Sequence, residues 1–239
     1  MTTSAAFDRG ASRYDLLVGL NPGYHQELRR AGRALVEGVG RRPGLRLIDL
    51  ACGTGASTRA LVGAAPVGAE VLGLDASHGM LEQAETHAWP KGVRFEHAIA
   101  GGLDVDRVGR GSYDGILTCY LFRNVPSQYR DAAIREVYDL LAPGGWLVVQ
   151  EYSVAGDRRS RLVWDAVCKA IIIPLGVLLD RNRDLYAYLW RSVVQFDSVG
   201  RFGDRLVAAG FTEVAHRTAS GWQRGILHTF VAHKPEETS

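Results

Sequence analysis

Short runs of β-branched and other apolar residues alternate with longer amphipathic stretches over most of this 239-residue chain. Each run is bounded by Gly, Asp or Pro, as strands usually are, and stretches with helical spacing separate the first five runs. This alternation is typical of βαβ units and predicts a doubly wound α/β fold with a mostly parallel, seven-stranded sheet. The expected strands are 45–50, 70–74, 93–97, 113–118, 146–150, 212–218 and 226–233.

Helical spacing predicts helices at 57–63, 77–88 and 128–141, and the segment Ala142-Pro-Gly-Gly145 stops the third of them. Ser77 and Ser127 are the expected N-caps of the second and third helices. Only residues 219–225 separate the final two strands, whereas a parallel crossover needs about a dozen residues. We therefore expect these two strands to pair as an antiparallel hairpin.

Composition narrows the class of protein. The formal net charge of +2 and a pI of about 8.5 indicate no concentrated basic field and disfavour a nucleic-acid partner. Cys52, Cys119 and Cys168 have no zinc-ligand spacing, and the N-terminus lacks the apolar stretch of a secretory signal, so we expect a reduced, cytoplasmic protein without a metal site. The longest apolar run, 170–179, is shorter than the roughly 20 residues of a membrane-spanning helix.

The strongest local signal is a buried-strand run that enters a Gly-x-Gly turn at Gly53 and Gly55. Such a turn lets the backbone approach a ligand at the carboxyl end of a strand, and Asp75 at the tip of the next strand is placed to bind a ribose diol. Thr58 stands where a dinucleotide fingerprint has its third glycine, and Asp49 would repel a pyrophosphate but accept hydrogen bonds from an ammonium group. The pattern predicts a nucleoside with a cationic tail; the alternative is a simple tight connection without a ligand.

Three motifs in order, Asp49-Leu-Ala-Cys-Gly-Thr-Gly55, Gly73-Leu-Asp-Ala-Ser-His-Gly-Met-Leu81 and Leu141-Ala-Pro-Gly-Gly-Trp-Leu-Val-Val149, resemble those of class I S-adenosylmethionine-dependent methyltransferases. Within that superfamily the chain is similar over nearly its whole length to the ubiquinone/menaquinone biosynthesis C-methyltransferases. The distinguishing matches are Phe7-Asp-Arg-Gly-Ala-Ser-Arg-Tyr-Asp15, Phe122-Arg-Asn-Val125 and Ala209-Gly-Phe-Thr212. The resemblance implies a Rossmann-like fold with the reversed final hairpin expected above.

The resemblance also implies S-adenosyl-L-methionine as cofactor, with S-adenosyl-L-homocysteine as product. Asp49 and the Gly53-Thr54-Gly55 turn would hold its methionine portion, Asp75 its ribose hydroxyls, and Tyr14 would cover it. The other cofactor contacts it implies are Ala51, Ala76, Met80, Ile99, Ala100 and Cys119. Ile99 is a departure, because family members usually present Asp or Asn to the adenine ring at this position and Ile cannot accept a hydrogen bond.

Methyl transfer requires in-line positioning, exclusion of water and in some cases one base, so a weak motif at the substrate end is expected. By resemblance Arg123 and Asn124 face the substrate, with Arg123 stabilising a phenolate or positioning a water molecule. A structural ion pair and a turn residue are their respective alternatives. His25 is a candidate general base because its ordinary pKa is about 6.5, and a surface or core histidine is the alternative.

These features predict a single methyltransferase domain over residues 1–239. Its parts are an N-terminal helical cap (1–42), a cofactor-binding core (43–152), a helical substrate cap (153–199) and a C-terminal helix and hairpin (200–239). Trp164, Tyr186, Tyr188, Trp190 and Phe196 lie in the substrate cap, where they would either wall an apolar site or form an ordinary helical core.

The expected function is transfer of a methyl group to a small apolar aromatic or quinol-like acceptor, with C-methylation of a demethylmenaquinol or another prenylquinol as the leading case. An O-, N- or C-methyltransferase of specialised metabolism is the closest alternative. A non-catalytic cofactor-binding protein and a nicotinamide oxidoreductase are two further alternatives, and the oxidoreductase would need the complete glycine fingerprint. The sequence leaves open a homodimer and peripheral contact with a membrane.

Overall fold

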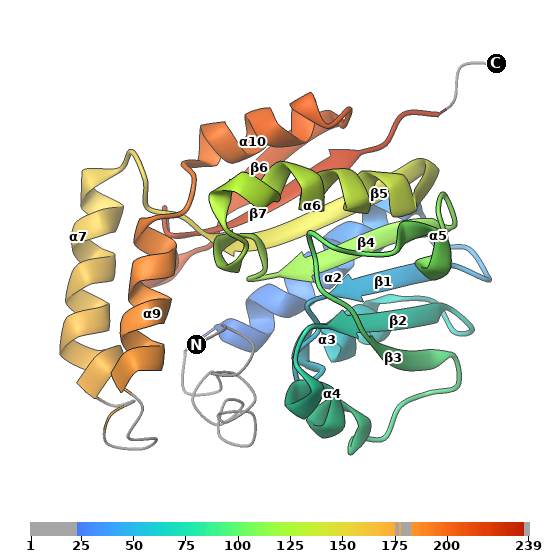
Figure 1. The fold of residues 1–239 in the computed structure, drawn as a ribbon, viewed down its shortest axis with the longest axis horizontal. Helices are drawn as coiled ribbons and strands as arrows, with labels where there is room; N and C mark the ends of the chain where they lie inside the picture. Colours follow the sequence, from blue (N-terminus) through green and yellow to red (C-terminus); the bar gives the residue numbers. More distant parts are fainter. Residues whose placement is uncertain (1–22, 175–176, 178–182, 237–239) are drawn as a thin grey trace.

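The computed structural model describes residues 23–174, 177 and 183–236. A seven-stranded sheet in the order β3-β2-β1-β4-β5-β7-β6 forms its centre (Figure 1). The strands are β1 (Arg46–Leu50), β2 (Glu70–Asp75), β3 (Val93–His97), β4 (Tyr113–Cys119), β5 (Leu141–Tyr152), β6 (Thr212–Thr218) and β7 (Leu227–His233). The first five strands are parallel, whereas β7 runs antiparallel to both β5 and β6. The predicted doubly wound sheet and its antiparallel C-terminal hairpin are confirmed.

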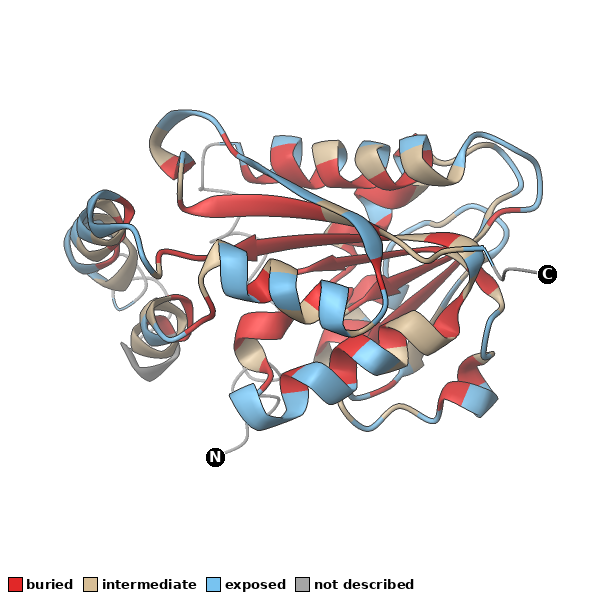
Figure 2. Ribbon diagram, turned by 90° about the horizontal axis from the view of Figure 1, so that it is seen from above, coloured by how far each residue is buried: buried red, intermediate tan, exposed pale blue. Residues whose placement is uncertain are grey.

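Helices cover both faces of this sheet, and a separate apolar core fills each interface. One face is covered by α2 (Tyr24–Val39) and α3 (Ala56–Ala64), and the other by α5 (Val105–Val108), α6 (Ser127–Leu140) and α10 (Val199–Ala208). α4 (His78–Glu85) packs against β2 and β3 at the edge. Figure 2 shows the buried positions on the strands and on the sheet-facing sides of the helices.

α2 lies in one of these layers against a face of the sheet, whereas the sequence analysis assigned it, with the rest of residues 1–42, to a helical cap. Its residues Leu35 and Val39 press on Gly115 of β4, where an added Cβ atom would stand 2.9 Å from Leu35 Cδ1 and 3.0 Å from Val39 Cγ1. A glycine is therefore needed there for the close approach of helix and sheet. Within the described part of α2, only Tyr24 reaches the cavity described below.

Two local predictions about the termini of elements differ in outcome. Ser77 caps α4 as expected, because its Oγ accepts a hydrogen bond from Met80 N at 3.1 Å. Ser127 is not a cap: α6 begins with it, and the preceding Pro126 has no side chain that can accept. β5 starts at Leu141 and not at residue 146. Its early part is bonded to Lys234, just after β7: Gly144 N donates to Lys234 O at 3.0 Å, and Lys234 N donates to Gly145 O at 2.8 Å.

Most of the described residues of the predicted substrate cap, 153–199, are helical. The cap contains α7 (Arg158–Val167), a π-helical turn, η2 (Cys168–Ile172), and α9 (Arg183–Val194), which project beyond the sheet at one end of the molecule (Figure 1). Among the described residues, no helix combines the length and the apolar character that crossing a bilayer would require.

Candidate active site

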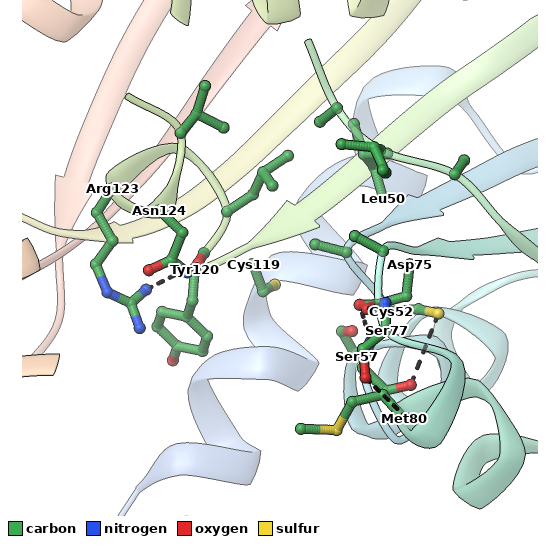
Figure 3. A pocket seen from close by; sticks show the side chains of 18 of the residues that line it. Leu50, Cys52, Ser57, Asp75, Ser77, Met80, Cys119, Tyr120, Arg123 and Asn124 are labelled. Carbon is green, nitrogen blue, oxygen red and sulfur yellow. Dashed lines mark hydrogen bonds between the residues drawn. The ribbon is translucent and has the colours of Figure 1, made fainter. Parts of the chain in front are cut away.

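A cavity of about 730 Å3 opens at the carboxyl ends of β1, β2 and β4. Here the chain reverses the direction in which it adds strands, and doubly wound sheets place their ligands at such a switch point. Figure 3 shows the cavity with Asp75, Ser77 and Met80 on one side and Arg123 and Asn124 on the other. We refer to these sides as the Asp75 end and the Asn124 end.

The turn from β1 to α3 builds the Asp75 end largely from backbone. Gly53 (φ 54°) and Gly55 (φ 92°) are left-handed, and so is the non-glycine residue Ala51 (φ 63°). Strain of this kind at a non-glycine residue is concentrated at functional sites. Leu74 O holds the turn against β2 by accepting from Ala51 N at 2.7 Å.

Asp75 links this turn to the start of α4. Its Oδ2 accepts from Gly53 N at 2.8 Å and its Oδ1 from Ser77 N at 2.9 Å. Burial raises the pKa of this carboxyl, and the backbone donors of Ser77 and Gly53 oppose the rise. A carboxylate has about four acceptor positions, so the backbone donors Gly53, Ser77 and Ala76 leave acceptor capacity on Asp75, which lines the cavity.

Asp49 lies beneath the turn and does not line the cavity. Its Oδ2 accepts from Ser57 Oγ at 2.8 Å and from Thr58 Oγ1 at 2.6 Å. Thr58, which replaces a fingerprint glycine, thus ties α3 to β1. Asp49 Oδ1 has no hydrogen-bond partner among the described residues, and burial raises the pKa of Asp49 to about 6.

The predicted adenine contacts, Ile99 and Ala100, are apolar and line the cavity, and Ile99 is 57% exposed. Met80, another predicted cofactor contact, lines the cavity as well. Two histidines that the sequence analysis missed lie beside them: the rings of His78 and His97 stack at 4.1 Å with 8° between their planes, and both line the cavity. The sequence held a signal for this pair, because His97 ends an expected strand and His78 directly follows the expected N-cap Ser77.

An ion pair between Arg123 and Glu151 forms the core of the Asn124 end. Arg123 Nη1 lies 3.0 Å from Glu151 Oε1, and Arg123 N donates to Glu151 Oε2 at 3.2 Å. Arg123 is 8% exposed and lines the cavity, whereas Glu151 is fully buried. Burial raises the pKa of Glu151, and the adjacent Arg123 cation opposes that rise. Arg123 therefore forms a structural ion pair and also lines the cavity, so both alternatives given for it in the sequence analysis apply.

Asn124 is held from two sides. It lies in the short helix η1 (Phe122–Asn124), and its Nδ2 donates to Tyr120 O at 2.8 Å. Tyr188 of α9 donates from its hydroxyl to Asn124 Oδ1 at 3.1 Å. The substrate cap thus reaches the cavity through a specific hydrogen bond.

A stack of aromatic rings continues from this end into the helical hairpin of α7 and α9. Tyr120 stacks on Tyr24 with ring centroids 5.8 Å apart and on Tyr152 at 5.1 Å, and Tyr152 stacks on Trp164 of α7 at 5.3 Å. Tyr120 is left-handed (φ 64°), so the backbone is strained here as it is at Ala51. The sequence analysis identified Trp164 but missed Tyr24 and Tyr120.

Most of the predicted site residues come together at the cavity, and a few do not. Those that line it are Ala51, Gly53, Thr54, Asp75, Ala76, Met80, Ile99, Ala100, Cys119, Arg123 and Asn124. Gly55 faces Trp89, because an added Cβ atom would lie 2.8 Å from its Cζ2 atom. His25 is exposed on α2 and does not line the cavity, so it is not placed as a general base. Tyr14 lies outside the described residues.

The Asp75 end fits a nucleoside with a cationic tail. Asp75 offers acceptor oxygens for a diol, and the Cβ position of Gly53 has no atom within 4 Å, which leaves room for a ligand against the backbone. The unpartnered Oδ1 of Asp49 supplies negative charge just beneath.

Comparison with known proteins gives a consistent result. Residues 3–234 match the ubiE/COQ5 methyltransferase family. The chain is 34% identical over 215 residues to a demethylmenaquinone methyltransferase of Clavibacter sepedonicus, covering 90% of this chain and 84% of the relative. It is 32% identical over 213 residues to the ubiquinone/menaquinone biosynthesis C-methyltransferase UbiE of Methylobacterium nodulans, covering 88% and 83%.

A solved structure with a similar fold is phosphoethanolamine N-methyltransferase 2 of Haemonchus contortus in complex with phosphomonomethylethanolamine and S-adenosylhomocysteine. The TM-score is 0.68 at 16% identity, over 96% of this chain and 58% of that one. This likeness concerns the fold alone.

Proposed function

Because the chain belongs to the ubiE/COQ5 methyltransferase family, we propose that it transfers the methyl group of S-adenosyl-L-methionine to a ring carbon of a demethylmenaquinol-like quinol. The names of the matched relatives support this substrate class, since both act in quinone biosynthesis by name and each aligns over more than four fifths of its own length. The rival substrates of specialised metabolism have no comparable support.

One observation carries the proposal: a single cavity has a carboxylate, Asp75, at one end and a buried cation, Arg123, at the other. Two ligands that enter from these ends meet within one space, which is the arrangement that a direct group transfer requires. The cofactor supplies a methyl group made electrophilic by its sulfonium.

The residues of the chain supply position and electrostatics. A quinol carbon becomes nucleophilic as the ring hydroxyl loses its proton to solvent, and Arg123 would stabilise the resulting negative charge at the Asn124 end. As the ring carbon forms its bond to the methyl group, the bond from that methyl group to sulfur breaks and leaves a neutral thioether. The hydrogen on the methylated carbon then leaves as a proton, which restores the aromatic ring. Glu151 fixes the Arg123 guanidinium and is a positioning residue in this scheme. Asn124, oriented by Tyr188, offers its amide to a second hydroxyl. Apolar walls such as Leu121 and Val125 exclude water from the transfer.

The test combines binding and chemistry. The purified protein is titrated with S-adenosylhomocysteine by calorimetry, and then incubated with S-adenosylmethionine and a short-chain demethylmenaquinol kept reduced. We expect a product that is heavier by one methylene, with an NMR signal of a ring methyl group. A methoxy signal would move the proposal to O-methylation, and bound cofactor without turnover on quinols or hydroxylated aromatics would favour a non-catalytic protein.

A further inference from the structure

The outward side of α7 combines positive charge with exposed apolar side chains. Arg158, Arg159 and Lys169 are exposed along α7 and η2. Leu162 between them is 69% exposed and Ile171 is 57% exposed. The helix lies at the end of the molecule, with pale exposed positions along its outside (Figures 1 and 2).

The loop between β6 and β7 adds one cation to this side. An added Cβ atom on Gly225 would lie 2.5 Å from Ser160 Oγ and 3.4 Å from Asp157 Oδ2, so the loop packs on the first turn of α7. The exposed Arg224 therefore lies beside that turn. We call the exposed residues Arg158, Arg159, Leu162, Lys169, Ile171 and Arg224 the α7 surface.

The acidic residues nearby are engaged with partners of their own. Asp157 caps α7, accepting from Arg159 N at 2.9 Å and from Ser160 Oγ at 2.6 Å. Asp165 pairs with Arg161 at 3.1 Å and accepts from Trp190 Nε1 at 2.7 Å. No cation of the α7 surface forms an ion pair with a carboxylate in the part of the chain that the structure describes. The cations of the α7 surface are therefore available to an anionic partner, although the formal net charge of the whole chain is only +2.

The inner side of the same hairpin contacts the Asn124 end of the cavity. Trp164 of α7 stacks on Tyr152, and Tyr188 of α9 donates to Asn124. A partner bound to the outside of the hairpin is therefore adjacent to the end of the cavity at which the acceptor would enter.

We propose that the α7 surface docks on a bilayer containing anionic phospholipid, which supplies the apolar acceptor to the Asn124 end. Interleaved Leu and Ile favour a bilayer over a nucleic acid, because apolar chains gain by entering the headgroup and acyl boundary while cations bind the lipid phosphates. The role assigned to docking depends on the proposed function, whereas docking itself does not.

Vesicle flotation without cofactor or acceptor tests the docking. We expect the wild-type protein to float with vesicles of phosphatidylcholine and phosphatidylglycerol but not with pure phosphatidylcholine. Each cation near an anionic surface strengthens binding roughly fivefold, so the triple variant Arg158→Gln, Arg159→Gln, Arg224→Gln is expected to bind about a hundredfold more weakly. The matched control replaces three exposed arginines of other elements, Arg29, Arg33 and Arg135, and is expected to bind like wild type.

A second pair of variants tests the apolar contribution. Leu162→Gln is expected to lower vesicle binding several-fold, whereas Val207→Gln, at a 59% exposed position on α10, leaves it unchanged. The proposal would be overturned if the wild-type protein did not bind anionic vesicles. It would also be overturned if the surface variants and the control variants lost vesicle binding equally. Binding to a DNA duplex in place of vesicles would also overturn it.

The acceptor's location separates docking from the proposed function. With demethylmenaquinol embedded in anionic vesicles, the triple variant is expected to methylate slowly, while its rate on a water-soluble short-chain quinol matches wild type. Docking without methylation of either acceptor would contradict the proposed function alone. Equal rates of the triple variant and wild type on the embedded acceptor would contradict only the role of docking in acceptor supply.

Discussion

The two ends of the cavity are built in different ways. The Asp75 end consists of consecutive backbone in two strand-to-helix turns, joined by the hydrogen bonds that Asp75 accepts. The Asn124 end consists of side chains from separate elements: Tyr24 of α2, Arg123 of η1, Tyr152 of β5 and Tyr188 of α9. A binding site made of local backbone tolerates variation elsewhere, whereas one made of distant side chains changes whenever any of its elements changes. This difference predicts a constant cofactor end and an adaptable acceptor end.

The largest effect is expected from a substitution at the Asp75 end. Asp75→Ala removes the acceptors for Gly53 N, Ser77 N and the ribose, and charge-assisted hydrogen bonds are the strong ones, so S-adenosylhomocysteine affinity should fall roughly a thousandfold. Calorimetry measures this loss. Asp104→Ala, which removes a helix-capping aspartate from α5 away from the cavity, is the matched control and should leave the affinity unchanged. Equal affinity of Asp75→Ala and wild type would contradict the assignment.

Breaking the ion pair should affect the other end. Glu151→Gln leaves the Arg123 cation buried without a charged partner, which costs about 3 kcal/mol of unfolding free energy. Turnover on the quinol should fall, whereas the affinity for S-adenosylhomocysteine should remain unchanged. Urea unfolding and calorimetry measure these two quantities.

A second buried carboxylate provides the control for this variant. Asp197, in the segment before α10, pairs with Arg130 of α6 at 3.2 Å, with Arg205 at 2.8 Å and with Arg201 at 3.3 Å. Asp197→Asn weakens all three pairs, so we expect a loss of stability at least as large as that of Glu151→Gln, with turnover preserved. If both variants lose turnover equally, the Asn124 end has no special dependence on Glu151.

A pH-dependent effect is expected beneath the Asp75 end. The pKa of Asp49 is raised to about 6 in the folded protein from 3.8, so its contribution to stability is fully present below pH 3.8 and is lost as pH rises through about 6. Asp49→Asn stays neutral and should therefore be more stable than wild type above pH 7, by about 2 kcal/mol, with the difference shrinking near pH 5. Urea unfolding at both pH values checks this, and a difference that is the same at both would contradict it.

The smallest effect concerns a single hydrogen bond of the Asn124 end. Tyr188→Phe removes the donor to Asn124 Oδ1, a loss of about 1 kcal/mol, so kcat/KM for the quinol should fall about fivefold with cofactor affinity unchanged. Tyr129→Phe, at an exposed tyrosine that lines the cavity, is the control. An equal effect of the two substitutions would show that the contact with α9 does not position Asn124.

The sequence predicted local features best where one segment contains both partners of an interaction. Ser77 caps α4 through Met80, three residues on, and this prediction was confirmed. Ser127 had the same local signal, but Pro126 fixes the preceding backbone and α6 starts one residue earlier than a serine cap allows. His25 was predicted as a site residue and its neighbour Tyr24 was not, although Tyr24 is the one that lines the cavity. The sequence shows that a histidine can act as a base, but it does not show which side of the helix faces the cavity.

The acceptor end could not be predicted in the same way. Arg123 and Glu151 are 28 residues apart and Asn124 and Tyr188 are 64 apart. Nothing in the spacing of these residues identifies them as partners. The family resemblance pointed to Arg123 and Asn124, but not to the groups that orient them.

By itself, the sequence determined the order of strands and helices, the reversed final hairpin and the glycine turn with its acidic partner. These depend on hydrophobic period, connection length and backbone conformation, which are properties of neighbouring residues. The tertiary structure alone decided which buried charges pair, which tyrosines stack and which side of α7 carries cations to the surface. Burial and contact between distant segments arise only when the sheet and its helices pack, because the energy of an ion pair or a ring contact depends on distances in space and not on distance along the chain.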